Sequence, residues 1–445
     1  MKNKLSLLLL VPTLIFSSCS NQAPQEGTKA TIDLPANLRI STSTTTTPYK
    51  LTFNYKDSYF KQSSKTFNKD LALISLASCY ASVNENQYQG FLSTLKFDNI
   101  ETHFEKQKTK DTISYTLAHK KIDDFDLVTA VVDGFAYKAE WAGNFEVGEE
   151  GDHLGFSIAA NTVYQSLKTY IAQYENAKLW LTGYSRGAAV ANYLSYLVMS
   201  KDELGVSQDN FYVYTVESPK SLIKEHAFKY ENVFNIMNSR DIVTEVPPSK
   251  FELYRCGIDI DVYQANIKSL LRDFDPEIYI PSFKSKSGTY STEIEFKNWL
   301  IDIITEEDPG TDPDANYVSN RKEYVQYLEH PLITAFEIAY GLSDEGRSEL
   351  LTTLMSQALT GFEILFEEGK LFEVISPVLD KYQYPYDSDS LRSDCELLRK
   401  FAKGKLSLIS SAVSDSDLRN NVLRLVDNHY IDLNYVLLKN YTVTR

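Results

Sequence analysis

Residues 179–192 constrain the fold of this chain more than any other segment. They read Leu-Trp-Leu-Thr-Gly-Tyr-Ser-Arg-Gly-Ala-Ala-Val-Ala-Asn, which places the pattern Gly-x-Ser-x-Gly around Ser185. The apolar residues before the pattern predict a buried strand, and the small residues after it predict a helix that lies close to a sheet. Strand, sharp turn and helix are the setting of a nucleophile elbow, which exposes a serine hydroxyl at the top of the sheet. We expect Gly183 and Gly187 to occupy positions where a Cβ atom would clash with neighbouring atoms. The alternative interpretation of the pattern is an ordinary Gly/Ser turn.

The N-terminus has the pattern of a secretory signal peptide over residues 1–18. A positively charged start is followed by an apolar run and then by Ser17-Ser18 directly before Cys19. This resembles a bacterial lipobox and implies lipid attachment at Cys19; a plain cleavable signal is the alternative. Residues 19–48 are rich in Ser, Thr, Pro, Ala and Gln and predict a flexible tether. We therefore expect a secreted protein anchored by lipid to the bacterial cell envelope, at the outer membrane if the cell has one.

Charge and cysteine content narrow the possible partners. The net charge of −15 disfavours nucleic acid and a basic membrane-docking face. Beyond Cys19 there are three cysteines, an odd number that permits at most one disulfide and has no metal-site spacing. The acidic segment 306–314 does not follow the spacing of a calcium loop, so a solvated loop is expected. We expect no metal and no organic cofactor; the oligomeric state is left open.

Strands alternate with helices over about 125–260, which predicts an α/β sheet. We expect the α/β core to span residues 49–260. The expected strands are 127–132, 179–181, 211–216 and 233–237, with an antiparallel edge at 251–260; the expected helices are 70–82 and 156–174. Residues 261–415 are mostly helical by pattern, at 294–304, 324–340 and 349–372. We expect this insertion to cap the core, and residues 416–445 to return to the core with the catalytic base.

Serine hydrolysis needs a base for the hydroxyl proton, an acid that orients the base, and donors for the oxyanion. On this kind of sheet the chain order is serine, acid, histidine. Asp241 follows the expected strand 233–237 and is the predicted acid, with Glu217 as the competitor. The order requirement leaves His330 and His429 as possible bases. His429 lies close to the C-terminus, where the chain would return to the sheet.

Several of these segments together resemble the class 3 (fungal-type) lipases, in a bacterial lipoprotein form. The resemblance rests on the elbow, on a strand that ends Glu217-Ser218-Pro219, and on an acid loop over 234–248 that ends in Pro-Pro. It rests also on the segments 140–145 and 153–156, and on His429 together with Tyr435. The resemblance covers about 65–260 and the last twenty residues, whereas residues 261–415 match nothing in the family. It implies an α/β-hydrolase fold, Ser185 as nucleophile, Asp241 as acid and His429 as base.

The resemblance also implies an oxyanion hole, and two residues depart from the family pattern there. The main-chain N–H groups of Arg186 and Phe135 would hold the oxyanion. The oxyanion strand reads Asp133-Gly134-Phe135 where the family usually has Arg-Gly-Thr, and a carboxylate at Asp133 would oppose the anion if it faced the hole. Tyr184 stands before the serine where the family usually has histidine.

The function predicted from the sequence is a lipase-type serine hydrolase that cleaves carboxylic esters through an acyl-enzyme. Its substrate would be an acyl ester or lipid, bound beneath the cap. A peptidase or deacetylase on the same scaffold is one alternative. A surface lipoprotein with weak or absent catalysis is the other, because of Asp133 and Phe135.

Overall fold

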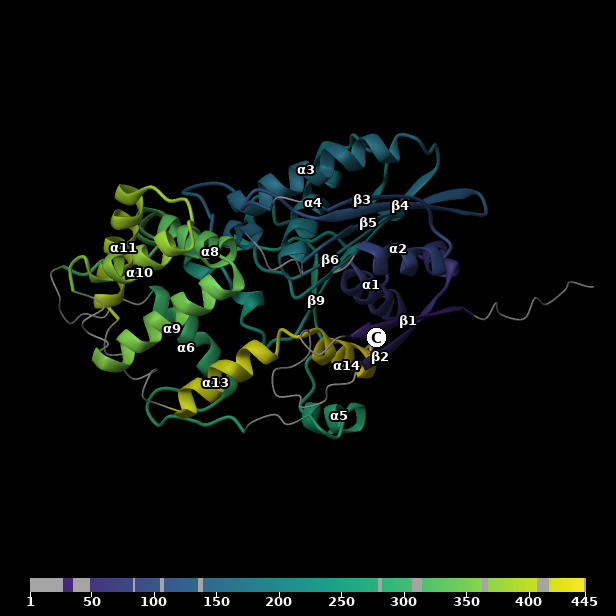
Figure 1. Ribbon diagram of the computed structural model, residues 1–445. Helices are drawn as coiled ribbons and strands as arrows, with labels where there is room; N and C mark the ends of the chain where they lie inside the picture. Colours follow the sequence, from purple (N-terminus) through teal and green to yellow (C-terminus); the bar gives the residue numbers. More distant parts are fainter. Residues whose placement is uncertain are drawn as a thin grey trace, which may run out of the picture.

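The computed structural model describes residues 27–34, 49–82, 85–104, 108–134, 139–278, 282–305, 314–361, 367–405 and 416–443. Within this part of the chain, a seven-stranded sheet has the order β11-β9-β7-β6-β5-β4-β3 (Figure 1). Neighbouring strands from β5 to β11 are parallel, and the β5-β4-β3 end is antiparallel. The strands are β3 (Asp98–His103), β4 (Tyr115–Ile122), β5 (Phe125–Val132), β6 (Ala177–Tyr184), β7 (Phe211–Val216), β9 (Val233–Met237) and β11 (Ile258–Asp261).

Helices cover both faces of this sheet (Figure 1). The helices α3 (Leu154–Ile171) and α4 (Arg186–Lys201) cover one face, and α1 (Lys69–Ala81) and α14 (Ile431–Asn440) cover the other. Leu179 and Leu181 of β6 pack with the first pair, whereas Trp180 packs with the second. Burial on both faces explains why the central strands lack polar alternation. The predicted α/β core, with its strands at 127–132, 179–181, 211–216 and 233–237, is confirmed.

Two sequence-based expectations about the core differ from the structure. Residues 251–260 were expected as an antiparallel edge, but the edge strand β11 pairs parallel with β9. Antiparallel pairing occurs just before it, where β10 (Leu253–Tyr254) pairs with β8 (Leu222–Ile223) outside the main sheet. The expected tether 19–48 contains strand β1 (Thr28–Leu34), which pairs with β2 (Tyr49–Tyr55). Alternating burial explains β1, since Ala30 and Ile32 pack into the core.

The insertion forms a helical lobe beside the carboxyl ends of the parallel strands (Figure 1). Its helices have a separate apolar core that includes Leu342, Leu379 and Cys395. The expected helix 324–340 is interrupted by a π-helical turn, and the expected run 349–372 is divided between two helices. The elements are α5 (Ile267–Phe274), α6 (Glu293–Thr305), α7 (Arg321–Tyr324), the π turn η7 (Val325–Glu329), α8 (His330–Gly341), α9 (Asp344–Gly361), α10 (Lys370–Lys381) and α11 (Ser388–Lys403).

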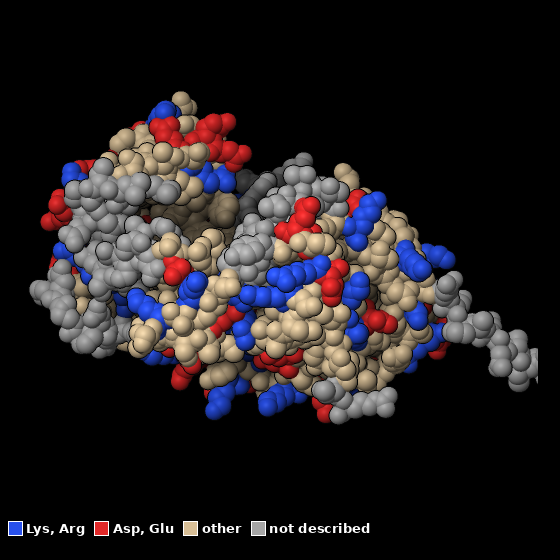
Figure 2. Space-filling model, turned by 90° about the horizontal axis from the view of Figure 1, so that it is seen from below, with Lys and Arg blue, Asp and Glu red and all other residues tan. Residues whose placement is uncertain are grey.

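The last helices return from this lobe to the core, with α13 (Ser416–Asp427) on the lobe side and α14 against α1 (Figure 1). The remaining elements are short and lie at the surface of the core or in its loops: α2 (Glu85–Thr94), η2 (Asp57–Lys61), η3 (Ala139–Asn144), η4 (Gln208–Asn210), η5 (Val243–Glu245) and η6 (Ser249–Phe251). On the face seen in Figure 2, basic and acidic side chains are interspersed. None of the described helices combines the length and apolar character that a membrane span requires.

Candidate active site

Ser185 lies in a sharp turn between β6 and α4, as the Gly-x-Ser-x-Gly pattern predicts. Its backbone has φ 54° and ψ −122°, a conformation that costs energy for a residue with a side chain. The Ser185 N–H donates to the carbonyl of Val216 at 2.9 Å, which ties the turn to the neighbouring strand. A Cβ at Gly183 would lie 2.2 Å from the Gly187 carbonyl oxygen, and one at Gly187 would lie 2.4 Å from the Val132 oxygen. Both glycines are therefore required by close backbone approach.

His429 lies in the loop between α13 and α14, and it contacts the serine and the predicted acid together. Its Nε2 is 2.8 Å from Ser185 Oγ, and its Nδ1 is 2.5 Å from Asp241 Oδ2. The carboxylate of Asp241 is fully buried and also accepts the N–H of Val243 at 2.9 Å. With the ring proton on Nδ1, Asp241 accepts it, and Nε2 is free to accept the serine proton. This is the geometry that a nucleophile, a base and an orienting acid require.

His330, the alternative base, and Glu217, the alternative acid, contact other groups. The His330 ring is 65% exposed, and its Nδ1 lies 2.6 Å from Asp394 Oδ1 in the cap. Glu217 follows β7 with a positive φ of 52°, and its carboxylate accepts the Asn238 N–H at 2.9 Å. Burial, together with the neighbouring charge of Asp241, raises the pKa of Glu217 well above its usual value. The structure thus places Glu217 beside the acid and not against the histidine.

The structure describes one of the two predicted oxyanion donors, Arg186. Arg186 follows the serine and opens α4, so its main-chain N–H belongs to the unpaired first turn of that helix. Phe135, the other predicted donor, lies outside the described residues. The residues just before it approach the elbow closely, since a Cβ at Gly134 would lie 1.7 Å from the Tyr184 carbonyl oxygen. Asp133 is buried, and its charge contributes to the raised pKa of the Cys79 thiol, about 12, for which burial is the main cause.

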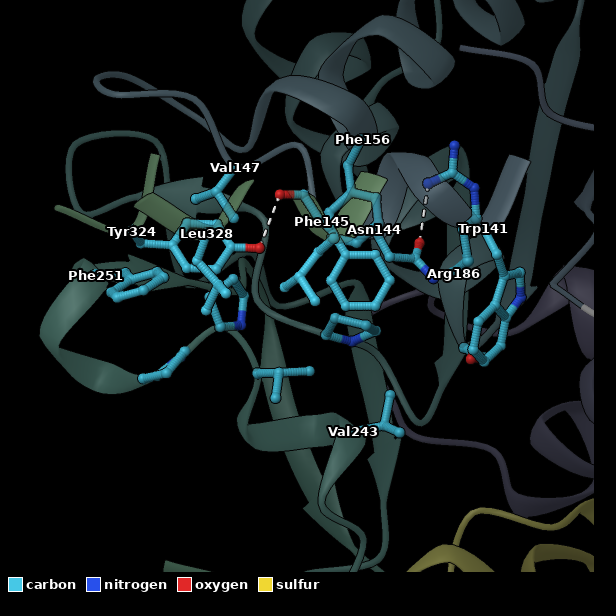
Figure 3. A pocket seen from close by; sticks show the side chains of 16 residues that line it. Trp141, Asn144, Phe145, Val147, Phe156, Arg186, Val243, Phe251, Tyr324 and Leu328 are labelled. Carbon is cyan, nitrogen blue, oxygen red and sulfur yellow. Dashed lines mark hydrogen bonds between the residues drawn. The ribbon is translucent and has the colours of Figure 1, made fainter. Parts of the chain in front are cut away.

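The Arg186 side chain is buried and braces the wall of the site. Its guanidinium donates to Asn144 Oδ1 at 2.9 Å (Figure 3). It also donates to the Lys110 carbonyl at 3.1 Å. Burial lowers the pKa of this guanidinium to about 10, so it remains charged at neutral pH. His153 holds the same wall, with Nε2 3.2 Å from the carbonyl oxygen of Asn144. The segment that carries Asn144 is therefore fixed from two sides.

An apolar cavity of about 270 Å³ opens at Ser185 (Figure 3). Core loops and the cap build it jointly, because Tyr324, Leu328 and Leu332 of the cap lie in its wall. The Tyr324 hydroxyl donates to the Phe145 carbonyl at 3.0 Å, which fastens the cap to the core wall. The remaining lining residues are Trp141, Asn144, Phe145, Val147, Phe156, Arg186, Pro219, Val243, Val246, Pro247, Pro248 and Phe251. Apolar walls with a few convergent polar groups at one end suit an acyl chain whose carbonyl reaches the serine.

Comparison with known proteins agrees with this geometry. Residues 91–251 match the family model described as lipase (class 3). Over this segment the chain is similar to the class 3 lipases. The chain is accordingly a lipase-type serine hydrolase, an enzyme of the carboxylic ester hydrolases, with an α/β-hydrolase fold. The matched segment contains Ser185 and Asp241 but ends before the cap and His429.

Solved lipase structures are similar to this chain at low identity. A fungal lipase in an inhibitor complex is 19% identical, with 46% of this chain and 80% of that chain covered and a TM-score of 0.35. The triacylglyceride lipase of Rhizomucor miehei is 17% identical, with 48% and 83% covered and a TM-score of 0.35. The lipase of Rhizopus microsporus var. chinensis is 18% identical, with 51% and 81% covered and a TM-score of 0.31. No curated protein matches the chain.

The sequence predicted that the insertion caps the site, but it did not single out the cap residues that line the cavity. Tyr324, Leu328 and Leu332 occupy an apolar helical pattern that reads as ordinary core packing. The π turn η7, which carries Leu328, has no signature that we recognised in the sequence. Cys19 and the acidic residues 306–313 lie outside the described residues. Among the residues that are described, no group of three or more His, Cys, Asp and Glu is arranged to hold a metal ion.

Proposed function

We propose that this protein hydrolyses acyl esters through a Ser185-His429-Asp241 triad and an acyl-enzyme. The observation that carries the proposal is the double contact of His429, with Nε2 at 2.8 Å from Ser185 Oγ and Nδ1 at 2.5 Å from Asp241. His429 accepts the serine proton as Oγ attacks the acyl carbon, and it then donates that proton to the departing alcohol. Water, deprotonated by the same ring, cleaves the acyl-enzyme and releases the carboxylic acid. The Arg186 N–H is the proposed oxyanion donor, joined by that of Phe135.

The cavity supports a substrate with an apolar acyl chain. Its volume is about 270 Å³, and its walls are mainly aromatic, proline and aliphatic side chains. Such walls stabilise a hydrocarbon chain by removing it from water. We propose short to medium acyl chains as the preferred substrates, with the ester carbonyl at Ser185.

A fluorophosphonate probe tests the chemistry, because only an activated serine reacts with it. The wild-type protein should be labelled and should hydrolyse p-nitrophenyl esters in a panel of increasing chain length. S185A should lose both properties while it keeps the wild-type circular dichroism spectrum. An unlabelled but folded wild-type protein would favour the binding lipoprotein. Cleavage of peptides or N-acetyl groups in preference to esters would favour the peptidase or deacetylase.

We also propose that the protein is held at the cell envelope by a lipid on Cys19. The support is the sequence Ser17-Ser18-Cys19 directly after an apolar run. Attachment of two acyl chains is enough for stable anchoring, whereas a single chain is marginal. C19S should therefore move the protein from the membrane fraction to the soluble fraction, and an unchanged distribution would remove the proposal.

A further inference from the structure

The first residue of cap helix α6, Glu293, joins the loop of the acid to the loop of the base. Its side chain is almost fully buried. Glu293 Oε2 accepts from Arg240 Nη1 at 3.0 Å and from Arg424 Nη2 at 2.9 Å, and its Oε1 accepts from Asn428 Nδ2 at 3.0 Å. The Glu293 carboxylate therefore accepts from the acid loop through Arg240, and from the end of α13 and the loop after it through Arg424 and Asn428.

Two of these three partners are direct neighbours of the triad in the sequence. Arg240 precedes Asp241, and Asn428 precedes His429. The two loops also contact each other, because Asn238 Nδ2 donates to the Asn428 carbonyl oxygen at 3.2 Å and to its Oδ1 at 3.1 Å. Glu293 therefore lies at the junction of the two loops that must bring acid and base together.

The same helix contacts the acid loop at one further point and the short helix η6, just after that loop, at another. One turn after Glu293, the buried Lys297 donates from Nζ to the Ser239 carbonyl at 2.6 Å. At the end of α6, Lys250 Nζ donates to the Thr305 carbonyl at 2.9 Å. Helix α6 is thus fixed along its length to residues 239–250, and a rigid helix is a better support for a catalytic geometry than a loop.

The charges around Glu293 hold its carboxylate in place. One buried carboxylate faces two guanidinium groups, and a buried charge is tolerated only when it is paired and hydrogen-bonded. Arg240 is further held by stacking on Tyr263, whose ring centroid lies 4.0 Å from its guanidinium carbon. The arginine that precedes Asp241 therefore has little freedom to move while Glu293 is in place.

We propose that Glu293 is a positioning residue of the triad, through which the cap sets the relative placement of Asp241 and His429. It touches no reacting atom and acts through Arg240 and Asn428. The inference rests on the proposed Ser185-His429-Asp241 chemistry and goes beyond it, since it makes the insertion a part of the active site and not only a cover for the acyl chain.

The first test compares E293Q with D394N. Asp394 is a matched control, because it is a buried cap carboxylate whose partners, His330 at 2.6 Å and Thr334 at 2.7 Å, both lie in α8. E293Q should lower kcat and the fluorophosphonate labelling rate by about 10-fold to 100-fold, the cost of a small misplacement of catalytic groups, with KM within about twofold. D394N should leave kcat within about twofold of wild type. An E293Q enzyme with wild-type kcat overturns the proposal.

The second test reverses the polarity of one contact and remains informative if E293Q alone is unstable. N428D would place two carboxylates together and should lower kcat. In that background, E293Q offers an amide N–H to the carboxylate introduced at position 428, so kcat should rise above that of N428D by at least about threefold. Glutamine at 293 is thus expected to be harmful beside asparagine and beneficial beside aspartate. A further fall in kcat in the double variant contradicts a positioning role through Asn428.

The fate of H429A separates this inference from the proposed function. If H429A is inactive while E293Q is fully active, the triad stands and the role of Glu293 is wrong. If H429A keeps wild-type turnover, the proposed triad itself fails and the positioning role fails with it.

Discussion

The Tyr184 hydroxyl donates a hydrogen bond to the main-chain carbonyl of His429, 245 residues later in the chain. Tyr184 occupies the elbow position directly before Ser185, where the related family usually has histidine. Its ring centroid lies 5.2 Å from that of the imidazole. One residue of the elbow therefore holds the backbone of His429 while the next residue, Ser185, contacts its ring. The departure from the family pattern coincides with a contact that joins the elbow to the proposed base.

Replacing Tyr184 with phenylalanine removes this contact and keeps the ring. A typical hydrogen bond contributes about 0.5–1.5 kcal/mol, so Y184F should lower kcat by roughly threefold to tenfold with a small change in Tm. Steady-state kinetics on a p-nitrophenyl ester measure the effect. Y193F is a suitable control, because Tyr193 lies on α4 outside the lining of the cavity. Equal kinetics for Y184F and wild type would show that the contact does not influence the base.

The two histidines that satisfy the chain order should respond very differently to alanine. H429A removes the group that contacts both Ser185 and Asp241, and kcat should fall by about 10⁴-fold to 10⁶-fold. His330 is largely exposed and pairs with Asp394 in the cap, so H330A should keep kcat within about threefold. The reverse ranking would move the base into the insertion. Single-turnover measurement of acyl-enzyme formation gives the clearest comparison.

The glycines of the elbow should not tolerate a side chain. A Cβ at Gly187 would meet the Val132 carbonyl oxygen at 2.4 Å, and the first turn of α4 cannot move away from the end of β5 without opening the elbow. G187A should therefore lower the free energy of unfolding by about 3 kcal/mol or more, seen as a lower Tm or insoluble protein. G90A is the matched control: Gly90 lies in α2 with nothing within 4 Å of the added Cβ. Alanine there should be neutral or stabilise by up to about 1 kcal/mol.

A larger side chain at Leu328 should shorten the acyl chain that the enzyme accepts. Leu328 is buried in the cavity wall contributed by the cap. L328W should reduce kcat/KM for a p-nitrophenyl ester of about ten carbons by roughly tenfold or more, while the acetate ester changes by less than about twofold. L351W adds the same bulk on the same lobe at a residue that is 55% exposed, and should leave chain preference unchanged. An unaltered profile for L328W would place the acyl chain elsewhere.

Glu217 predicts a pH-dependent change in stability. Burial and the charge of Asp241 raise the pKa of Glu217 in the folded chain above 4.5, its ordinary value in the unfolded chain. At a pH between the unfolded and the folded pKa, the folded chain therefore holds a proton that the unfolded chain has lost. The wild-type free energy of unfolding therefore falls as pH rises through that window, with a slope of up to about 1.4 kcal/mol per pH unit. Glutamine does not titrate. E217Q should exceed wild type in Tm at about pH 8, and the difference should shrink toward about pH 4; a difference independent of pH would contradict this reading.

Much of the core was predictable because its signals are local. Trp180 and its apolar neighbours predict a buried strand, and residues 179–184 of the observed β6 are buried. The start of α1 was similarly visible, and Asn68 caps it by accepting from Asp70 and Leu71 N–H groups. Strand β1 was missed because Ser, Thr and Pro dominate the surrounding segment, and the alternation of Ala30 and Ile32 is too short to stand out.

By itself, the sequence determined the elbow and the order in which acid and base had to follow it. Gly183, Ser185 and Gly187 act within a few residues of one another, so steric exclusion at the turn is readable from their spacing. Whether His429 or His330 faces Ser185 was decided only by the tertiary structure, because it depends on how α13 and α14 pack back onto the sheet after the whole cap. The same holds for Glu293: its burial between Arg240 and Arg424 arises from contacts over more than fifty residues, for which the sequence contains no local pattern.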